Sequence, residues 1–195
     1  MPQAQPDLYT RSSSTADGRA VITRRVHAPA EVVWSVLADG WLYATWVVGA
    51  SRIRTVQPEW PNPGGRLHHS FGVWPALIDD HTEVLTSDPR RELLLKARGW
   101  PAGEAHVRIK VTPTGADGSI VSIAEDATGG PARFIPRAVR QRLISPRNTE
   151  ALRRLALIAE GRHRQTRSTT QTTNRTDGFA FSGVNQADRT TAHRD

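Results

Sequence analysis

The sequence contains no cysteine among its 195 residues. This absence excludes disulfide bonds and every zinc or iron–sulfur site with cysteine ligands, and it is typical of a reducing, intracellular compartment. No stretch approaches the roughly 20 apolar residues that cross a bilayer. The polar segment 1–17 also lacks the apolar core of a signal peptide. We therefore expect a cytoplasmic protein.

Several catalytic motifs are also missing from the chain. It has no Gly-x-Ser-x-Gly nucleophile elbow, no phosphate-binding Gly-Lys-Ser/Thr loop and no strand-linked Gly-x-Gly-x-x-Gly turn. These absences argue against a nucleophilic hydrolase, a nucleotidase or a dinucleotide-dependent enzyme. His68 and His69 are neighbours, and neighbouring strand residues point to opposite faces, so the pair cannot share an ion unless the strand bulges. We therefore expect neither a metal nor a cofactor.

The net charge is +7, and arginine is concentrated in one stretch of the chain. Within residues 133–154 only Glu150 opposes a set of seven arginines, namely Arg133, Arg137, Arg140, Arg142, Arg147, Arg153 and Arg154. A solvated helix face would produce this pattern, and so would peripheral contact of Arg133–Arg154 with an anionic membrane. Only Phe134 interleaves with the arginines, so the segment gives no strong nucleic-acid signal. No pattern in the sequence indicates an oligomeric state.

The chain is predicted to form one domain between two disordered tails. Segments 1–18 and 163–195 are polar and cannot bury enough apolar surface to offset the entropy of ordering. The remaining segment, 19–162, is long enough to fold as one ordinary domain without disulfides.

The hydrophobic period changes twice along this domain. A strand at 20–27 precedes a helix that Pro29 opens and that runs to Ala38, and a second short helix or turn follows at 41–47. Period-two segments then predict strands at 51–57, 66–74, 77–85, 91–98, 104–112 and 120–126. Short connections between consecutive strands imply an antiparallel meander. A short basic helix is predicted at 135–143, and Ser145-Pro146 begins a last helix at 147–161.

Two segments carry a family resemblance. The run Val26-His27-Ala28-Pro29-Ala30-Glu31-Val32-Val33-Trp34-Ser35-Val36-Leu37-Ala38-Asp39 resembles the entry segment of the SRPBCC superfamily, which includes polyketide cyclases/dehydrases and START-like lipid-transfer proteins. The turn Ser87-Asp88-Pro89-Arg90-Arg91-Glu92-Leu93 is similar to its Asp-Pro turn between middle strands. The resemblance implies an α+β helix-grip fold, in which a curved antiparallel sheet surrounds a long C-terminal helix and two short helices follow the first strand. It also implies a cavity between sheet and helix.

Period-two alternation indicates which side chains face that cavity. The inward set comprises Leu67, His69, Phe71, Val73, Leu95, Val107, Ile109 and, if the last strand turns its apolar face inward, Ile123 and Glu125. Helical spacing adds Leu152 and Leu155 from the last helix. Trp41 and Trp46 are expected to flank the entrance. We expect these apolar residues to bind the ligand.

The sequence leaves two functions open. The first is binding of a hydrophobic small molecule, such as a lipid, a polyketide or an aromatic metabolite, in an apolar pocket. The alternative is an enzyme resembling the polyketide cyclases and dehydratases, with His69 and Glu125 as acid–base groups. Against catalysis, His69 can equally be a buried, hydrogen-bonded core residue, and Glu125 can lie at an exposed strand end. The sequence does not decide whether the protein is an enzyme.

Overall fold

The computed structural model describes residues 10–14, 20–73, 76–99 and 103–180. Its strands are β1 (Thr10–Ser14), β2 (Ala20–Val26), β3 (Ala50–Val56), β4 (Arg66–Val73), β5 (Ala76–Asp88), β6 (Glu92–Gly99), β7 (Gly103–Pro113) and β8 (Ser119–Gly129). Its helices are α1 (Ala30–Ala38), the 3-10 turn η1 (Gly40–Leu42), α2 (Tyr43–Trp46), the 3-10 turn η2 (Pro131–Phe134) and α3 (Arg137–Ala180).

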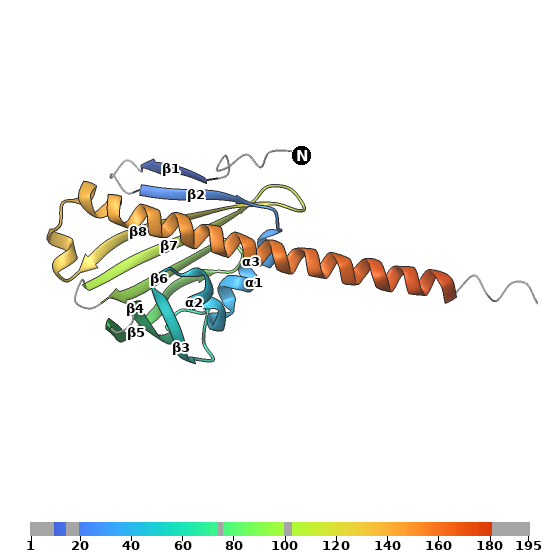
Figure 1. The fold of residues 1–195 in the computed structure, drawn as a ribbon, viewed down its shortest axis with the longest axis horizontal. Helices are drawn as coiled ribbons and strands as arrows, with labels where there is room; N and C mark the ends of the chain where they lie inside the picture. Colours follow the sequence, from blue (N-terminus) through green and yellow to red (C-terminus); the bar gives the residue numbers. More distant parts are fainter. Residues whose placement is uncertain (1–9, 15–19, 74–75, 100–102, 181–195) are drawn as a thin grey trace, which may run out of the picture.

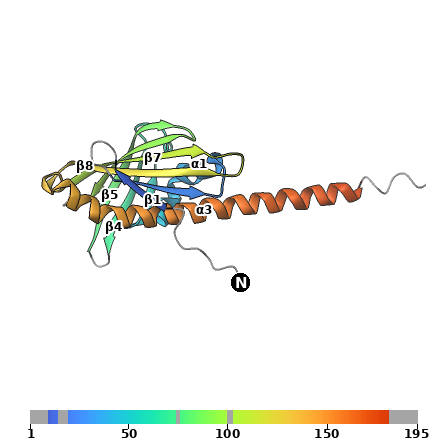
Figure 2. The ribbon, with the colours of Figure 1, turned by 90° about the horizontal axis from the view of Figure 1, so that it is seen from above.

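All the strands of these ranges form one antiparallel sheet in the order β1-β2-β8-β7-β6-β5-β4-β3. Among these strands, only β2 and β8 are paired without being consecutive in the chain. The strands from β3 to β8 therefore form an antiparallel meander, and the last strand of the meander pairs with β2. The sheet is curved, and α3 lies across its open face while α1 and α2 lie beside α3 (Figures 1 and 2). This arrangement confirms the predicted helix-grip fold.

Helix α1 begins where the sequence indicates and is fixed to α3 by a polar contact. Pro29 precedes its first residue, and Val33, Val36 and Leu37 are buried at helical spacing. At its other end, the Arg162 guanidinium of α3 donates hydrogen bonds to the Ser35 carbonyl at 3.1 Å and to Asp39 Oδ2 at 3.0 Å. A cation at the carboxyl end of a helix also interacts favourably with its dipole.

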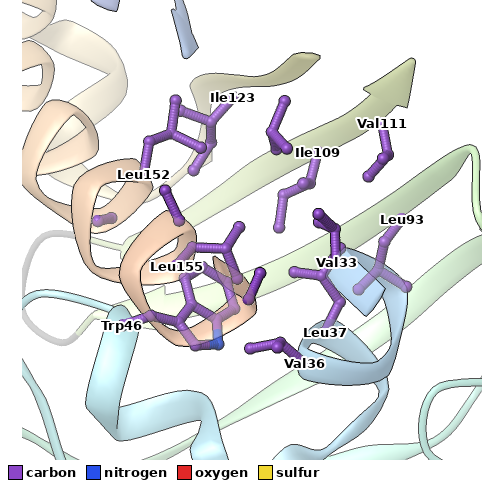
Figure 3. Packing of buried hydrophobic residues seen from close by; sticks show 14 of the residues in the cluster. Val33, Val36, Leu37, Trp46, Leu93, Ile109, Val111, Ile123, Leu152 and Leu155 are labelled. Carbon is purple, nitrogen blue, oxygen red and sulfur yellow. The ribbon is translucent and has the colours of Figure 1, made fainter. Parts of the chain in front are cut away.

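The core lies between the concave face of the sheet and α3, as the alternation predicts. Inward residues of four strands are fully or almost fully buried, including Leu67, Leu93, Leu95, Ile109, Val111, Val121 and Ile123. Leu152 and Leu155 of α3 join the same cluster, together with the buried face of α1 (Figure 3). Each such side chain stabilises the fold by about 1.5–3 kcal/mol relative to its exposed form.

The last helix differs from the prediction at its start. Ser145-Pro146 was expected to separate two helices, but α3 is continuous from Arg137 with Pro146 inside it. Proline removes one backbone hydrogen bond and crowds the preceding turn, yet its fixed φ is compatible with a helix. Ile144 and Asn148, on either side of the proline, both line a cavity between the sheet and α3 that is described below. Contacts on both sides therefore hold the helix together through a residue that usually ends one.

The two predicted tails also contain regular structure where they are described. Ser12 of β1 pairs with Ile22 of β2, and α3 continues beyond residue 162 to Ala180 (Figure 1). Backbone pairing along an edge strand does not require apolar side chains, and an existing helix extends at one hydrogen bond per added residue. Hydrophobic patterns reveal neither effect. The rest of the predicted tails, 1–9, 15–18 and 181–195, lies outside the described residues.

No helix in the described part of the chain is both long enough and apolar enough to cross a membrane.

Candidate functional site

A cavity of about 260 Å³ lies between the sheet, α2 and the first half of α3. Its apolar wall includes Trp46, Phe71, Leu95, Val107, Ile123 and Ala151. An engineered apolar cavity of about 150 Å³ binds benzene, so a cavity of about 260 Å³ has room for a small organic molecule. An apolar wall with a few polar groups is the usual character of a small-molecule site.

Most residues expected from sequence at the cavity are found there. Seven of them line it: Trp46, His69, Phe71, Leu95, Val107, Ile123 and Glu125. Four others are buried but do not line it, namely Leu67, Ile109, Leu152 and Leu155. They belong to the cluster that contains Val33, Val36 and Leu37, so side chains of α1 fill that half of the space between sheet and helix (Figure 3). The cavity occupies only the other half.

Trp41 does not flank the cavity as expected. It lies in η1, where its backbone N–H donates to Asp39 Oδ1, and its side chain is 60% exposed. The 3-10 turn ends at Leu42, and the next residue, Tyr43, is the buried aromatic that lines the cavity. The side chain of Val73 lies outside the described part of the structure.

A hydrogen-bonded network joins three elements at the cavity. Thr82 Oγ1 of β5 lies 3.1 Å from Tyr43 Oη of α2 and 3.1 Å from His69 Nε2 of β4. Burial raises the pKa of Tyr43 to about 12 and lowers the pKa of His69 below its ordinary value. At neutral pH the site therefore presents a protonated phenol and an uncharged imidazole. Sequence reasoning missed Tyr43 and Thr82, although Thr82 shares the buried face of β5 with Val84.

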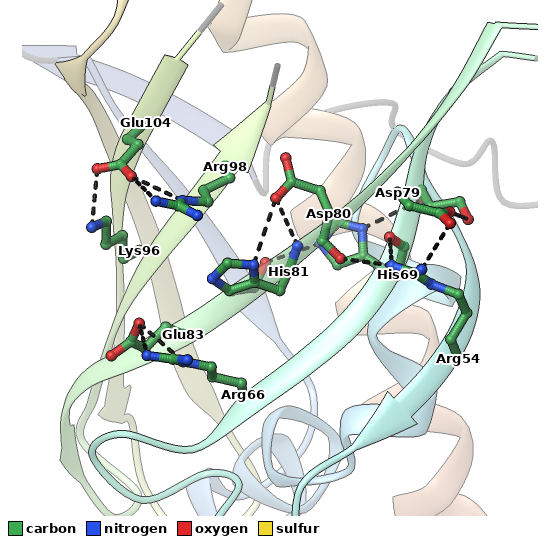
Figure 4. Close-up of polar contacts among 12 residues, drawn as sticks. Arg54, Arg66, His69, Asp79, Asp80, His81, Glu83, Lys96, Arg98 and Glu104 are labelled. Carbon is green, nitrogen blue, oxygen red and sulfur yellow. Dashed lines mark hydrogen bonds and ion pairs between the residues drawn. The ribbon is translucent and has the colours of Figure 1, made fainter. Parts of the chain in front are cut away.

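An arginine behind this network holds the neighbouring strands. Arg54 Nη2 donates to the carbonyls of His69 and Asp80, each at 3.2 Å, and Arg54 Nη1 lies 2.8 Å from Asp79 Oδ2 (Figure 4). Arg54 belongs to β3, at a point where the pairing of β3 with β4 shifts register. The guanidinium thus links the backbones of β4 and β5 beside the imidazole and fixes where His69 lies.

An ion pair between a buried carboxylate and a guanidinium whose side chain is 33% exposed forms a second polar group of the cavity. Glu125 of β8 accepts a hydrogen bond from Arg147 Nη2 of α3, and the Glu125 side chain is only 8% exposed. The carboxylate therefore lies on the inner face of β8 rather than at an exposed strand end. Arg147 and the buried Asn148 also line the cavity, and neither was expected there, because helical spacing identified only the apolar residues of this helix, Leu152 and Leu155, as facing inward.

The facing ends of β6 and β7 contribute charged residues to the cavity wall. Arg98 and Glu104 line it there, and Glu104 accepts hydrogen bonds from Arg98 at 2.9 Å and from Lys96 at 3.0 Å (Figure 4). These contacts lower the pKa of Glu104 below its usual value. Because the three side chains are between 30% and 46% exposed, their charges are screened by solvent.

The histidines at 68 and 69 are separated by the sheet. His69 is buried at the cavity, whereas the His68 ring lies 5.7 Å from the ring of His81, its partner across β4 and β5. Across the described ranges, no group of three or more His, Asp or Glu side chains is arranged to hold a metal ion.

The arginine-rich segment divides into paired and exposed parts. Glu150 pairs with Arg153 and Arg154 at 2.7 and 2.8 Å, and Arg147 pairs with Glu125. Arg142 is exposed, and the side chains of Arg133, Arg137 and Arg140 lie outside the described part. Beside them, Phe134 is 81% exposed, and Ile135 and Val139 are also exposed. Cationic and apolar residues therefore adjoin at the start of α3.

Comparisons with known proteins agree with this geometry. Residues 18–160 match the family model described as polyketide cyclase / dehydrase and lipid transport. A search of curated proteins finds no match. Among solved structures, a Rhodobacter sphaeroides protein has 21% identity and a TM-score of 0.59. The alignment covers 76% of this chain and 97% of the Rhodobacter chain.

Two further structures share the fold at lower identity. A START superfamily protein from Mycobacterium smegmatis has 19% identity and a TM-score of 0.53, covering 76% of this chain and 98% of its own. The di-domain ARO/CYC StfQ from the steffimycin biosynthetic pathway has 15% identity and a TM-score of 0.55, covering 73% of this chain and 51% of its own. At these identities the likeness establishes the fold.

Proposed function

Because the chain belongs to the polyketide cyclase / dehydrase and lipid transport family, within the START-like SRPBCC superfamily, we propose that it binds a hydrophobic small molecule. The observation that carries the proposal is the apolar cavity of about 260 Å³ between sheet and α3. A packed protein interior leaves few voids larger than a water molecule. A space of this size, walled by Trp46, Phe71 and Leu95, favours an apolar occupant such as a lipid fragment, a polyketide or an aromatic metabolite.

A cavity-blocking variant tests the proposal. Ala105 lines the cavity from β7, so Ala105→Phe should fill part of the space. Ala124→Phe, on the other face of the neighbouring strand β8, is the matched control, since Ala124 does not line the cavity. We expect 2-acetylnaphthalene to quench tryptophan fluorescence saturably in the wild type and in Ala124→Phe, and not in Ala105→Phe. Equal binding by Ala105→Phe, or no saturable binding by the wild type, would contradict the proposal.

A second candidate function is acid–base catalysis on a carbonyl compound, as in polyketide cyclisation or dehydration. The observation that favours it is the Tyr43–Thr82–His69 network at the cavity wall. The uncharged imidazole can accept a proton from the carbon beside a carbonyl through Thr82, whose hydroxyl oxygen takes that proton while its own proton passes to His69 Nε2. The Tyr43 phenol, turned from Thr82 toward the ligand, donates a hydrogen bond to the oxygen that becomes negative. Glu125, paired with Arg147, is the second acid–base candidate.

Proton exchange distinguishes catalysis from binding alone. In D₂O, the wild type should accelerate exchange of the methyl protons of 2-acetylnaphthalene, as followed by NMR. His69→Gln should lose that acceleration while the fluorescence titration still shows binding. Glu125→Gln measures the contribution of the second carboxylate. Catalysis would be contradicted if the wild type bound the ketone without accelerating proton exchange. It would also be contradicted if both variants exchanged the methyl protons as fast as the wild type, and binding alone would then be the function.

We also propose that the start of α3 makes peripheral contact with an anionic membrane. The exposed Phe134, Ile135 and Val139 adjoin an arginine-rich sequence, and they lie close along the chain to Ile144, which lines the cavity. Apolar side chains flanked by cations are typical of surfaces that rest on anionic lipid headgroups. A hydrophobic ligand held at this end of the domain would thereby be near a lipid phase.

A further inference from the structure

His68 and His81 lie opposite each other on the outer face of the sheet. They are cross-strand partners of β4 and β5, and their ring centroids are 5.7 Å apart. The next residues along the chain, His69 and Thr82, point to the inner face, where His69 Nε2 lies 3.1 Å from Thr82 Oγ1. Because successive side chains of a strand alternate, the same two strands carry one polar pair on each face. The proposed binding and catalysis use only the inner pair.

The separation of the two rings suits ligation of one ion by both imidazoles. A nitrogen–metal bond of about 2.1 Å, with the radius of the ring added, places a ring centroid roughly 3.2 Å from the ion. Two rings on one ion are therefore about 5.2 Å apart at a tetrahedral angle and at most about 6.4 Å apart. The observed 5.7 Å lies between these limits. Since β4 and β5 are already paired, only the two side chains need to turn toward the ion.

The surroundings of His81 favour an imidazole that can bind a metal, which must be unprotonated on the ligating nitrogen. Burial, followed by the nearby Arg98 guanidinium, lowers the pKa of His81 below its ordinary value, so the ring is mostly uncharged at neutral pH. Asp80 Oδ1 accepts a hydrogen bond from the His81 backbone N–H at 2.7 Å and lies 3.9 Å from His81 Nδ1. The carboxylate favours the tautomer with the proton on Nδ1, which leaves Nε2 for an ion.

The charged side chains that act on His81, together with their ion-pair partners, carry no net charge. Three are carboxylates and three are cations, namely Asp80, Glu83, Glu104, Arg66, Lys96 and Arg98. Glu83 is paired with Arg66 at 3.1 Å, and Glu104 is paired with Arg98 and Lys96 at 2.8 and 3.0 Å (Figure 4). These pairs engage the carboxylates that Ca²⁺ or Mg²⁺ would require, so the imidazoles favour an ion that prefers nitrogen ligands.

We propose that His68 and His81 bind one transition-metal dication, with Zn²⁺ and Cu²⁺ as ions that imidazole ligands suit. Within the described ranges no third His, Asp or Glu side chain completes such a group. Two protein nitrogens therefore hold the ion, and water takes its other positions. The ion joins β4 to β5 on the face opposite the contact between His69 and Thr82, and the site does not depend on a ligand in the cavity.

NMR of the imidazole rings in the full chain tests the site. One equivalent of Zn²⁺ should shift the ring signals of two of the seven histidines, and one of these two signals should be missing in His68→Asn and the other in His81→Asn. In calorimetric titrations with Cu²⁺, each variant should bind at least about tenfold more weakly than the wild type, since loss of an outer-shell partner alone costs that much. His106→Asn is the matched control, because it removes another partly exposed histidine, on β7, and it should leave the affinity unchanged.

Several results would overturn the site. They are a Zn²⁺ shift of one histidine signal or of none, a Cu²⁺ affinity that His68→Asn and His81→Asn leave unchanged, and an equal loss of affinity in His106→Asn. If a variant does not fold by circular dichroism, the number of histidine signals that Zn²⁺ shifts in the wild type decides. None of these outcomes bears on the binding of 2-acetylnaphthalene, which Ala105→Phe tests separately.

Discussion

Tyr43 and His69 are joined through a single hydroxyl group, because Thr82 Oγ1 lies 3.1 Å from Tyr43 Oη and 3.1 Å from His69 Nε2. The two rings are tilted against each other with centroids 5.3 Å apart. One consistent orientation has Tyr43 donating to Thr82, Thr82 donating to His69 Nε2, and His69 Nδ1–H pointing toward the Ser70 carbonyl at 3.5 Å. Burial supports this orientation, since it keeps the phenol protonated and the imidazole uncharged.

The buried imidazole should make stability depend on pH. Burial lowers the pKa of His69 below 6.5, the ordinary value. As the pH falls through 6.5, the unfolded chain binds a proton that the folded protein does not, so this contribution to stability is present above pH 6.5 and decreases below it. We predict that the Tm falls less between about pH 7.5 and 5.5 in His69→Gln than in the wild type.

His81 provides the comparison for this experiment. Burial also lowers its pKa, but its side chain remains 23% exposed. His81→Gln should therefore change the pH dependence of Tm in the same direction and to a smaller extent. A steeper pH dependence in His69→Gln than in the wild type would contradict the assignment of an uncharged, buried imidazole.

Two leucines of α3 test the packing of the helix on the sheet. Leu155 is 1% exposed in the core cluster, whereas Leu157, two residues later, is 50% exposed. Leu155→Ala should lower the free energy of unfolding by about 2–5 kcal/mol, because it leaves a cavity beside the sheet. Leu157→Ala should change it by less than about 0.5 kcal/mol. Chemical denaturation of both variants measures the difference, and equal effects would show that α3 does not close the core.

Removal of the end of α3 should have little effect on stability. Among the α3 residues whose burial the structure describes, Ala159 is the last fully buried apolar residue, and residues 164–169 are exposed. Arg162, which joins α3 to Ser35 and Asp39, must be kept. A chain that ends at Arg167 should have a Tm within a few degrees of the full chain, as measured by calorimetry. A large decrease would mean that residues 168–195 stabilise the domain.

Vesicle co-sedimentation tests the proposed membrane contact. Binding should require phosphatidylserine in the vesicles and should weaken as salt is added. Arg142→Ala should lower the partition coefficient roughly fivefold, the equivalent of about 1 kcal/mol for a basic residue near an anionic surface. Phe134→Asp should lower it further. Leu77→Asp, an exposed apolar position on β5, is the control and should have no effect. Equal binding to phosphatidylcholine vesicles would contradict an electrostatic contact.

The alternation of residues along each strand was sufficient to predict one wall of the cavity. His69 and Phe71, Leu95, Val107 and Ile123 face inward because successive side chains of a strand point to opposite faces, and that period is a local property of the backbone. Helical spacing likewise predicted the burial of Leu152 and Leu155. The order of helical and period-two segments was enough to indicate the fold class.

Tertiary structure decided where the cavity ends and which polar groups meet in it. Side chains of α1 fill one half of the space beneath α3. Leu155 therefore packs in the core cluster without lining the cavity, whereas Trp46 lines the cavity. Pro146 suggested a break in the helix, but contacts on both sides of it keep α3 continuous and bring Arg147 to Glu125. Tyr43 meets Thr82 across 39 positions of sequence. Such pairs depend on how separate elements pack, and the periodicity of one element carries no information about the distance to another.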